Sequence, residues 1–280
     1  MNLLIISCVF PPEPIVSAQL SVDIATELSI RGYTLTVLSP RPTRPLNFEF
    51  DHEKKQSYIF KHSIIDSYTS PKSNIIGRFR ESYSFGKKCS KYISKNHKDI
   101  DVIYQNSWPL FAQFLIVKEA RRYGIPIVTH IQDIYPESIT NKLPLAKGIV
   151  NNILLPIDKY ICKHSSVVLC ISNNMKETIE TTRNVNKKKL QIVSNWHNED
   201  SFIEYNRKHL LLPRDSAPFT FMYLGNNGPV AGVDFLINAF SKAKIPNTRL
   251  IIAGSGSKTD YCKEATNSLV FSIRSIFNIP

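Results

Sequence analysis

Two glycine-containing segments near the C-terminus have the residue types of an anion-binding site. Gly225-Asn226-Asn227-Gly228 follows the apolar run 219–224, and Gly254-Ser255-Gly256 follows a second apolar run at 249–253. Residues that lack Cβ or tolerate positive φ let backbone N–H groups face an anion at the start of a helix. The helical pattern between the runs predicts a βαβ unit, which puts both loops at one edge of a parallel sheet. We predict a nucleotide diphosphate site there, although glycines that only turn the chain give the same pattern.

Polar residues also cluster just after the predicted strand 127–131. His130, Asp133 and Glu137 lie at its carboxyl end, where open parallel sheets bind ligands. We predict that these three residues belong to a ligand site. For a lone histidine at a strand end, a purely structural role stays open.

The loop after the first predicted strand, 2–9, supplies further candidates. Glu13, Ser17 and Gln19 lie between the proline pair at 11–12 and a helical pattern. Ser17 also has the side chain of an N-cap, which accepts a hydrogen bond from the first turn of a helix. We expect the three residues to form a functional loop at this strand end, or only to cap and turn the chain.

One pair of acids has the spacing of a metal site. Asp99-Ile100-Asp101 resembles a carboxylate pair that holds a divalent ion, but it directly precedes the apolar run 102–104. Acids in a turn before a strand are common, so we assign no metal to it. We expect no cofactor in the chain.

Basic residues dominate the predicted helix within 71–98. Lys87, Lys91 and Lys95 recur every four residues, which places them along one face of a helix. Like charges at this spacing repel by roughly 0.2–0.5 kcal/mol per pair, so an anionic partner would stabilise them. We expect this face to lie against an anionic membrane surface, with an ordinary solvated face as the alternative.

The composition is that of a globular, basic protein. The 280 residues are 42% hydrophobic, and 35 Lys and Arg against 23 Asp and Glu give a formal charge of +12. An anionic partner fits this charge, but no zinc-finger, RNP or basic-zipper pattern indicates nucleic acid. No apolar run reaches the roughly 20 residues of a membrane span and no signal peptide is visible, so we expect a cytoplasmic protein. Five scattered cysteines have neither disulfide nor metal-ligand spacing.

Alternating strand and helix patterns predict an α/β fold with two domains. Residues 1–200 indicate a complete Rossmann-like domain with a parallel sheet. Residues 201–217 are charged, bounded by proline and aperiodic, so we assign them to an interdomain linker. Residues 218–267 contain the βαβ unit with the glycine loops and predict a second, partial Rossmann-like domain.

Three stretches carry a resemblance to a known family. They are the segment 130–138 (HIQDIYPES), the turn 194–196 (SNW) and the run 219–257 with both glycine loops. In this order they resemble family 4 glycosyltransferases, most closely those that build capsular and lipid-linked bacterial polysaccharides. The resemblance covers residues 1–265.

This resemblance implies a GT-B architecture, in which two Rossmann-like domains face each other across a cleft. It also implies transfer of a sugar from a nucleotide diphosphate sugar to a hydroxyl of a lipid-linked or saccharide acceptor, with retention and without a metal. Asp133 and Glu137 match the family segment residue for residue, and that segment lines the cleft, so the resemblance implies catalytic roles for them and for His130. It also implies an acceptor-side position for the loop with Glu13, Ser17 and Gln19. The protein would act in surface polysaccharide synthesis, peripheral on the inner face of the cell membrane.

The chain departs from the family pattern in both loops. Val16-Ser17 stands where the family often has two glycines, and Asn226 and Ala231 stand where many members have Arg and Lys. Lys258 is our candidate to supply the missing positive charge. The predicted donor-binding residues are Gly225, Asn226, Asn227, Gly228, Gly254, Gly256 and Lys258.

The C-terminal part of the resemblance is incomplete. The family's pair of glutamates, separated by seven residues, does not occur after residue 219, and residues 268–280 read as a tail outside the family pattern. We therefore expect a chain truncated near residue 267, with apolar surface exposed in the second domain and no sugar transfer by this chain alone. The alternative is a non-catalytic acceptor-binding or scaffold module derived from such an enzyme. A dehydrogenase is excluded because no G-x-G-x-x-G follows the first strand.

Overall fold

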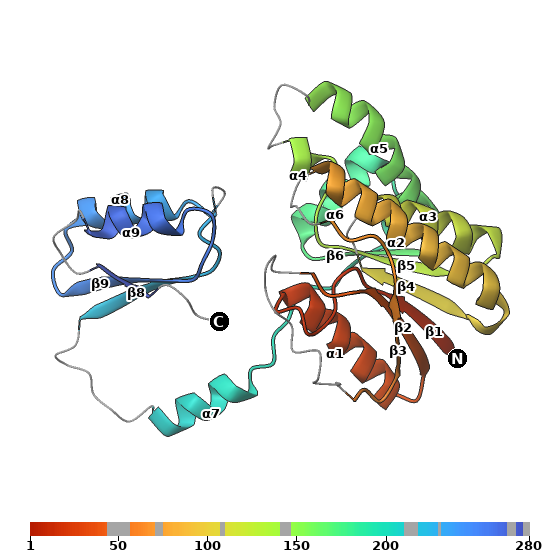
Figure 1. Cartoon of the computed structure of the whole chain (residues 1–280), viewed down its shortest axis with the longest axis horizontal. Helices are drawn as coiled ribbons and strands as arrows, with labels where there is room; N and C mark the ends of the chain where they lie inside the picture. The colour runs from red at the N-terminus through yellow and green to blue at the C-terminus, as the bar shows by residue number, and fades with distance from the viewer. Residues whose placement is uncertain are drawn as a thin grey trace. The chain divides into compact units, whose positions relative to one another are not determined.

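Two α/β units, Met1–His197 and Asn198–Pro280, make up the chain, and each contains a parallel sheet (Figure 1). The computed structural model describes residues 1–43, 57–70, 75–106, 110–140, 147–209, 218–228, 231–267 and 273–276. Within each unit the fold predicted from the sequence is confirmed, namely a Rossmann-like first unit and a smaller unit of the same type.

The first unit is built on a seven-stranded sheet. Its strands are β1 (Asn2–Ile6), β2 (Thr34–Pro40), β3 (Lys61–Ile65), β4 (Val102–Asn106), β5 (Ile127–Ile131), β6 (Val167–Cys170) and β7 (Leu190–Ile192). The spatial order is β3-β2-β1-β4-β5-β6-β7, and all neighbours are parallel. The strand order reverses between β1 and β4, which creates the topological switch point where such sheets bind ligands.

Helices cover both faces of this sheet. They are α1 (Val16–Ile30), α2 (Ile75–Asn96), α3 (Leu110–Arg122), α4 (Glu137–Thr140), α5 (Lys147–His164) and α6 (Asn173–Arg183). Right-handed crossovers place α2, α3 and α5 on one face, where they share a buried cluster with the strands, and α1 packs in a separate cluster on the other.

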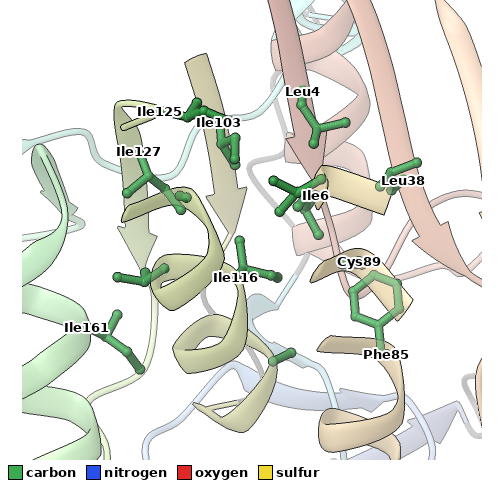
Figure 2. Close-up of a cluster of buried hydrophobic side chains, with 14 of the residues drawn as sticks. Leu4, Ile6, Leu38, Phe85, Cys89, Ile103, Ile116, Ile125, Ile127 and Ile161 are labelled. Atoms are coloured by element: carbon green, nitrogen blue, oxygen red, sulfur yellow. The ribbon is translucent and has the colours of Figure 1, made fainter. Parts of the chain in front are cut away.

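The side chains of β1 pack alternately into the two clusters. Leu4 and Ile6 point into the cluster under α2, α3 and α5, which Figure 2 shows, whereas Ile5 points toward α1. Successive side chains of a strand alternate between faces, so a strand buried on both sides has a continuous apolar sequence. This explains why apolar runs in the sequence located these strands.

The second unit is a three-stranded parallel sheet of order β10-β9-β8. Its elements are α7 (Asp200–His209), β8 (Phe219–Leu224), α8 (Val233–Ala243), β9 (Thr248–Ala253), α9 (Thr259–Asn267) and β10 (Ile273–Ile276). Its small core holds Val233, Ile237, Leu250, Ile252 and Cys262. Met222 and Leu224 on β8 are 58% and 67% exposed, in line with the apolar surface expected in this unit.

Two elements lie in segments that the sequence assigned to a linker and to a tail. The predicted linker 201–217 begins with a helix, because α7 extends through His209, and residues 210–217 lie outside the described part. The predicted tail 268–280 contains a strand, because β10 pairs in parallel with β9 from Ile273 opposite Leu250 to Ile276 opposite Ala253.

None of the helices in the described ranges is long and apolar enough to cross a membrane. The acids at 99 and 101 lie at the turn before β4, where the Asp101 carboxylate accepts a hydrogen bond from the backbone N–H of Asn2 at 2.7 Å. This contact gives Asp101 a structural role in joining β1 to the turn.

Candidate functional site

The two glycine loops of the second unit interlock. The backbone N–H of Asn227 donates to the carbonyl of Ser255 at 3.0 Å, and the N–H of Lys258 donates back to the carbonyl of Asn227 at 2.8 Å. The Asn227 side-chain amide also donates to the carbonyl of Gly254 at 3.1 Å. The loops after β8 and β9 therefore form one structure, and the predicted adjacency is confirmed.

Glycine is required at two positions of this contact. Gly254 has φ +135°, and a Cβ there would lie 1.9 Å from the carbonyl oxygen of Gly225. A Cβ on Gly256 would lie 2.3 Å from the side-chain oxygen of Asn226. Both glycines thus allow close backbone approach, a structural requirement that does not depend on a ligand.

Two buried polar atoms at this junction have no hydrogen-bond partner in the described part of the chain. Asn227 is fully buried, and its Oδ1 is unpaired, as is the Oγ1 of Thr259 at the first residue of α9. Buried polar groups are nearly always paired, so unpaired ones next to a helix N-terminus mark a place for a ligand or water.

Lys258 lies in this site but is already engaged. Its Nζ is 3.2 Å from Oδ2 of Asp234 in the first turn of α8, and both side chains are about one third exposed. The hydrogen bond from Lys258 lowers the pKa of Asp234, so the carboxylate stays charged. Any anion that binds Lys258 must therefore compete with Asp234.

In the first unit, Ser17 joins two loops. Its Oγ donates to Oε1 of Gln132 at 2.7 Å, which connects α1 to the residue after β5. The predicted N-cap role of Ser17 is wrong, because α1 begins at Val16 after Ile15, which makes no side-chain cap. Gln132 was not among the predicted site residues.

The other residues of the predicted acceptor-side loop have separate environments. Glu13 is buried, and its Oε1 accepts the backbone N–H of Thr43 at 2.6 Å. Gln19 is exposed and donates to Asp23 at 2.6 Å, and Asp23 also accepts the indole N–H of Trp196 at 3.1 Å. Glu13 therefore fixes the loop, while Gln19 is exposed and Ser17 is half-buried.

His130 and Asp133 differ in accessibility. His130 is fully buried, and its Nδ1 lies 2.7 Å from the hydroxyl of Tyr104. Burial lowers its pKa, so the ring is neutral at neutral pH, and its Nε2 has no hydrogen-bond partner in the described part of the chain. Asp133 is exposed at the end of the same segment. Of these two groups, only Asp133 can reach a bound molecule directly.

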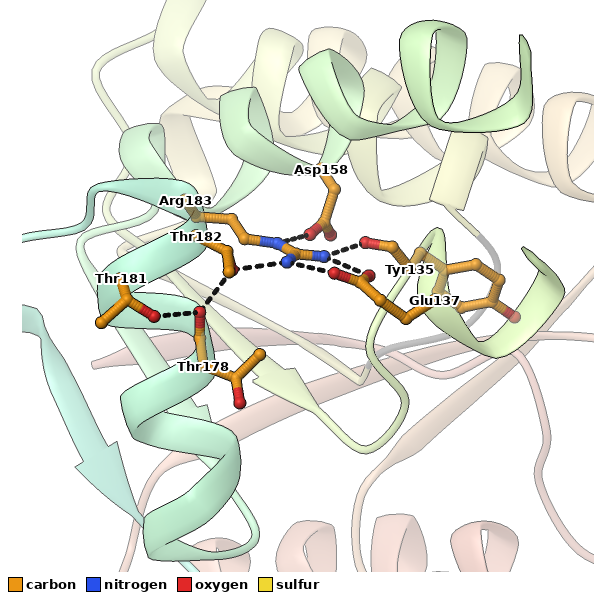
Figure 3. Close-up of polar contacts among 7 residues, drawn as sticks. All are labelled: Tyr135, Glu137, Asp158, Thr178, Thr181, Thr182 and Arg183. Carbon is orange, nitrogen blue, oxygen red and sulfur yellow. Dashed lines mark hydrogen bonds and ion pairs between the residues drawn. The ribbon is translucent and has the colours of Figure 1, made fainter. Parts of the chain in front are cut away.

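Glu137 is held by an arginine that the sequence did not single out. Figure 3 shows the guanidinium of Arg183, at the end of α6, between Glu137 and Asp158 of α5. It makes a two-bond contact with the Glu137 carboxylate at 2.6 and 2.7 Å and donates from Nε to Asp158 at 2.7 Å. It also donates to the carbonyl of Tyr135. The segment 133–138 is therefore fixed to two helices by one buried side chain.

The two carboxylates respond differently to this arginine. Burial would raise the pKa of Glu137, but the hydrogen bonds and charge of Arg183 outweigh it and hold the pKa below its ordinary value. Asp158 is more deeply buried, and burial raises its pKa to about 6 despite the attraction of Arg183. Glu137 thus stays ionised at neutral pH.

A buried polar cluster lies at the switch point of the sheet. The side-chain amide of Asn106, the last residue of β4, donates to the hydroxyl of Ser21 at 2.9 Å and to that of Ser7 at 3.3 Å. The two hydroxyls are 2.8 Å apart. This cluster fixes the start of α1 against the ends of β1 and β4. Asn106 at a strand end was the sequence signal that could have identified it.

Comparison with known proteins agrees with this geometry. The family model for Glycosyltransferase Family 4 matches residues 18–201. An uncharacterized glycosyltransferase of Methanocaldococcus jannaschii is 28% identical over 130 residues, which are 44% of this chain and 32% of that protein. The match thus spans about a third of the length of this curated relative.

Two solved structures share the fold. HepE from Anabaena in complex with UDP has a TM-score of 0.64 at 16% identity, covering 100% of this chain and 70% of that one. WaaG, a glycosyltransferase involved in lipopolysaccharide biosynthesis, has a TM-score of 0.59 at 13% identity, covering 99% and 70%. The fold is therefore of the GT-B type. Because the family model matches more than half of its residues, the chain belongs to Glycosyltransferase Family 4.

Proposed function

We propose that this chain carries sites for the transfer of a sugar from a nucleotide diphosphate sugar to a hydroxyl, with the donor's phosphates at the interlocked loops of the second unit. The observation that carries this proposal is the unpaired buried hydroxyl of Thr259 at the first residue of α9, next to Lys258, because both groups can donate to a phosphate. The unpaired Oδ1 of Asn227 only accepts, so its place is with a donor such as a water or a hydroxyl of the ligand. Anions are stabilised at helix N-termini by free N–H groups and by the helix dipole. HepE, which shares the fold, was solved with UDP and with UDP-glucose.

The chemistry requires stabilisation of the leaving phosphate. Such transfer depends on groups that face the charge as it develops, so backbone N–H groups and Lys258 are the candidates in the second unit. In the first unit, we assign the acceptor hydroxyl to exposed Asp133. Glu137, fixed by Arg183, and His130, paired with Tyr104, position the segment around it. Retention of configuration and independence of metal are parts of this proposal.

The acceptor belongs to the same proposal. A lipid-linked or saccharide acceptor of bacterial surface polysaccharide, capsule included, fits a basic protein whose α2 carries Lys87, Lys91 and Lys95 exposed along one face. Each lysine near an anionic bilayer contributes about 1 kcal/mol to binding. We therefore place the protein in the cytoplasm, peripheral on the membrane surface.

A titration with UDP tests the donor site. Asn226→Asp introduces a negative charge beside the phosphates, and we expect about five- to tenfold weaker binding. Asn238→Asp on the exposed face of α8 is the matched control, with the same charge change, and should bind like the wild type. Equal affinities for the wild type and Asn226→Asp would place the phosphates elsewhere. Turnover of UDP-glucose with a saccharide acceptor then separates an enzyme from a binding module.

A further inference from the structure

The groove between α2 and α3 contains two adjoining cavities of different character. The first, of about 510 Å³, is lined by Tyr68, Ile76, Phe79, Arg80, Tyr83, Ser84 and Phe111. The second, of about 400 Å³, is lined by Tyr83, Lys87, Ser90, Leu115, Lys118, Glu119 and Arg122. Tyr83 belongs to both, so the cavities follow each other along the two helices.

Close packing of the helices below the groove gives it a fixed floor. A Cβ on Gly86 of α2 would lie 2.5 Å from Cα of Ala112 on α3, so the two backbones touch there. The backbone N–H of Ala112 donates to the Ser82 hydroxyl at 2.9 Å, and the rings of Phe79 and Phe111 meet edge to face at 5.1 Å. The cavities therefore lie along two closely packed helices, and Tyr68 from the segment before α2 completes the wall of the first.

The first cavity is apolar and open at an apolar rim. Its walls are mainly aromatic, and its one cation, Arg80, lies 4.7 Å over the ring of Tyr68. Ile76 is 73% exposed and Tyr83 is 54% exposed at the rim. A tyrosine whose hydroxyl faces water and whose ring contacts apolar groups is typical of a membrane interface. The volume lies in the roughly 300–1,000 Å³ range of small-molecule sites.

The second cavity is cationic. Lys87, Lys118 and Arg122 line it against one carboxylate, Glu119, which lies 3.8 Å from Arg122. The buried hydroxyl oxygen of Ser90 has no hydrogen-bond partner within the described ranges. Three cations and an unused hydroxyl form a site for a phosphate group.

We propose that this groove binds one anionic phospholipid of the bilayer, with an acyl chain in the apolar cavity and the headgroup phosphate in the cationic cavity. The order of the two cavities along α2 matches the order of tail and phosphate in such a lipid. Lys91 and Lys95 continue the cationic surface past Lys87 along the helix. The inference rests on the proposed membrane contact and adds a lipid-specific site to it.

Sedimentation with vesicles tests the charge. Vesicles of phosphatidylcholine with and without phosphatidylglycerol are mixed with the full chain at about 0.1 M salt, where surface charges are screened beyond roughly 10 Å. Lys87→Gln/Lys118→Gln should weaken binding to the anionic vesicles by about 30-fold, equivalent to about 2 kcal/mol. The matched control Lys187→Gln/Lys188→Gln makes the same charge change at two exposed lysines just before β7 of the same unit. It should bind like the wild type. Equal losses in both variants would mean that only net charge matters, and would overturn the site.

The apolar cavity is tested separately. Ile76→Ser/Tyr83→Ser removes exposed rim residues, so folding should be preserved, and we expect weaker vesicle binding. Ile30→Ser/Tyr33→Ser, at the exposed end of α1, is the matched control. Dihexanoyl phosphatidylglycerol should compete with vesicles, whereas glycerol phosphate should not. Competition by glycerol phosphate, or unchanged vesicle binding of Ile76→Ser/Tyr83→Ser, would show that no acyl chain enters the apolar cavity.

Failure of the lipid-site proposal can be distinguished from failure of the donor-site proposal. UDP affinity should be the same in all four variants, because none of the changed residues lies in the second unit. Loss of membrane binding in the Lys91→Gln/Lys95→Gln variant alone, with the groove variants unaffected, would support general adsorption and contradict the lipid site.

Discussion

Replacing Arg183 by methionine should strongly destabilise the first unit. The Arg183 side chain is fully buried and Asp158 is 9% exposed, so the variant leaves a carboxylate buried without its cation. Removing one partner of a buried pair costs about 3–5 kcal/mol. The contact with Glu137 adds less, because that side chain is 44% exposed and water can replace the arginine. We therefore expect a loss of about 3–4 kcal/mol in the free energy of unfolding.

Urea unfolding followed by tryptophan fluorescence measures this loss. Both tryptophans of the sequence, at positions 108 and 196, precede residue 198, so the signal reports on the first unit. The control is Arg183→Met/Asp158→Leu, which removes both charges and should recover at least half of the loss, because an apolar pair needs no counter-ion. A loss below about 1 kcal/mol in Arg183→Met, or no recovery in the double variant, would refute the reasoning.

Three further outcomes follow from the site geometry. Asp158→Asn should lower the free energy of unfolding by about 1 kcal/mol more at about pH 5 than at about pH 7. The pKa of Asp158 is raised in the folded state, so the wild type gains stability as the pH falls through that window, and the variant does not. Urea curves at both pH values test the sign. Gly254→Ala should abolish UDP binding, because its Cβ would strike the Gly225 carbonyl, and Gly32→Ala, also at positive φ, is the control for strain alone. Asp234→Asn should strengthen UDP binding about two- to fivefold by freeing Lys258, with no gain in a Lys258→Gln background.

Local patterns predicted the elements that local physics controls. The apolar runs located β1 and β5, since strands covered on both faces need apolar residues throughout, and a third apolar run located β9. Serine favours the N-cap position, and the side chain of Ser172 at the N-cap of α6 accepts the N–H of Met175. The lysine face of α2 followed from spacing alone.

Long-range contacts could not be predicted in this way. Arg183 and Glu137 are 46 positions apart, and nothing around Arg183 differs from an ordinary basic residue in the last turn of a helix. Ser17 was assigned to an N-cap because serine favours that position, but its hydroxyl donates to the side chain of Gln132 in the loop after β5. The helix α7 had a local signal that was missed, since Asn198 accepts the N–H of Asp200 at 2.9 Å.

The predicted site residues differ in the kind of evidence behind them. The glycine loops follow from chain geometry, and the structure brings them together as expected. The roles of Asp133, Glu137 and His130 came from the family resemblance. The structure adds that Glu137 is ion-paired and His130 buried, which leaves Asp133 as the accessible group.

Hydrogen exchange of the full chain with and without UDP tests the central claim most directly. If the interlocked loops hold the donor's phosphates, UDP should slow exchange at the backbone N–H groups of residues 225–228 and 254–259. Exchange in the first unit's switch-point cluster, around Ser7 and Asn106, should change less. Saturating UDP with protection elsewhere and none in these two loops would contradict the account.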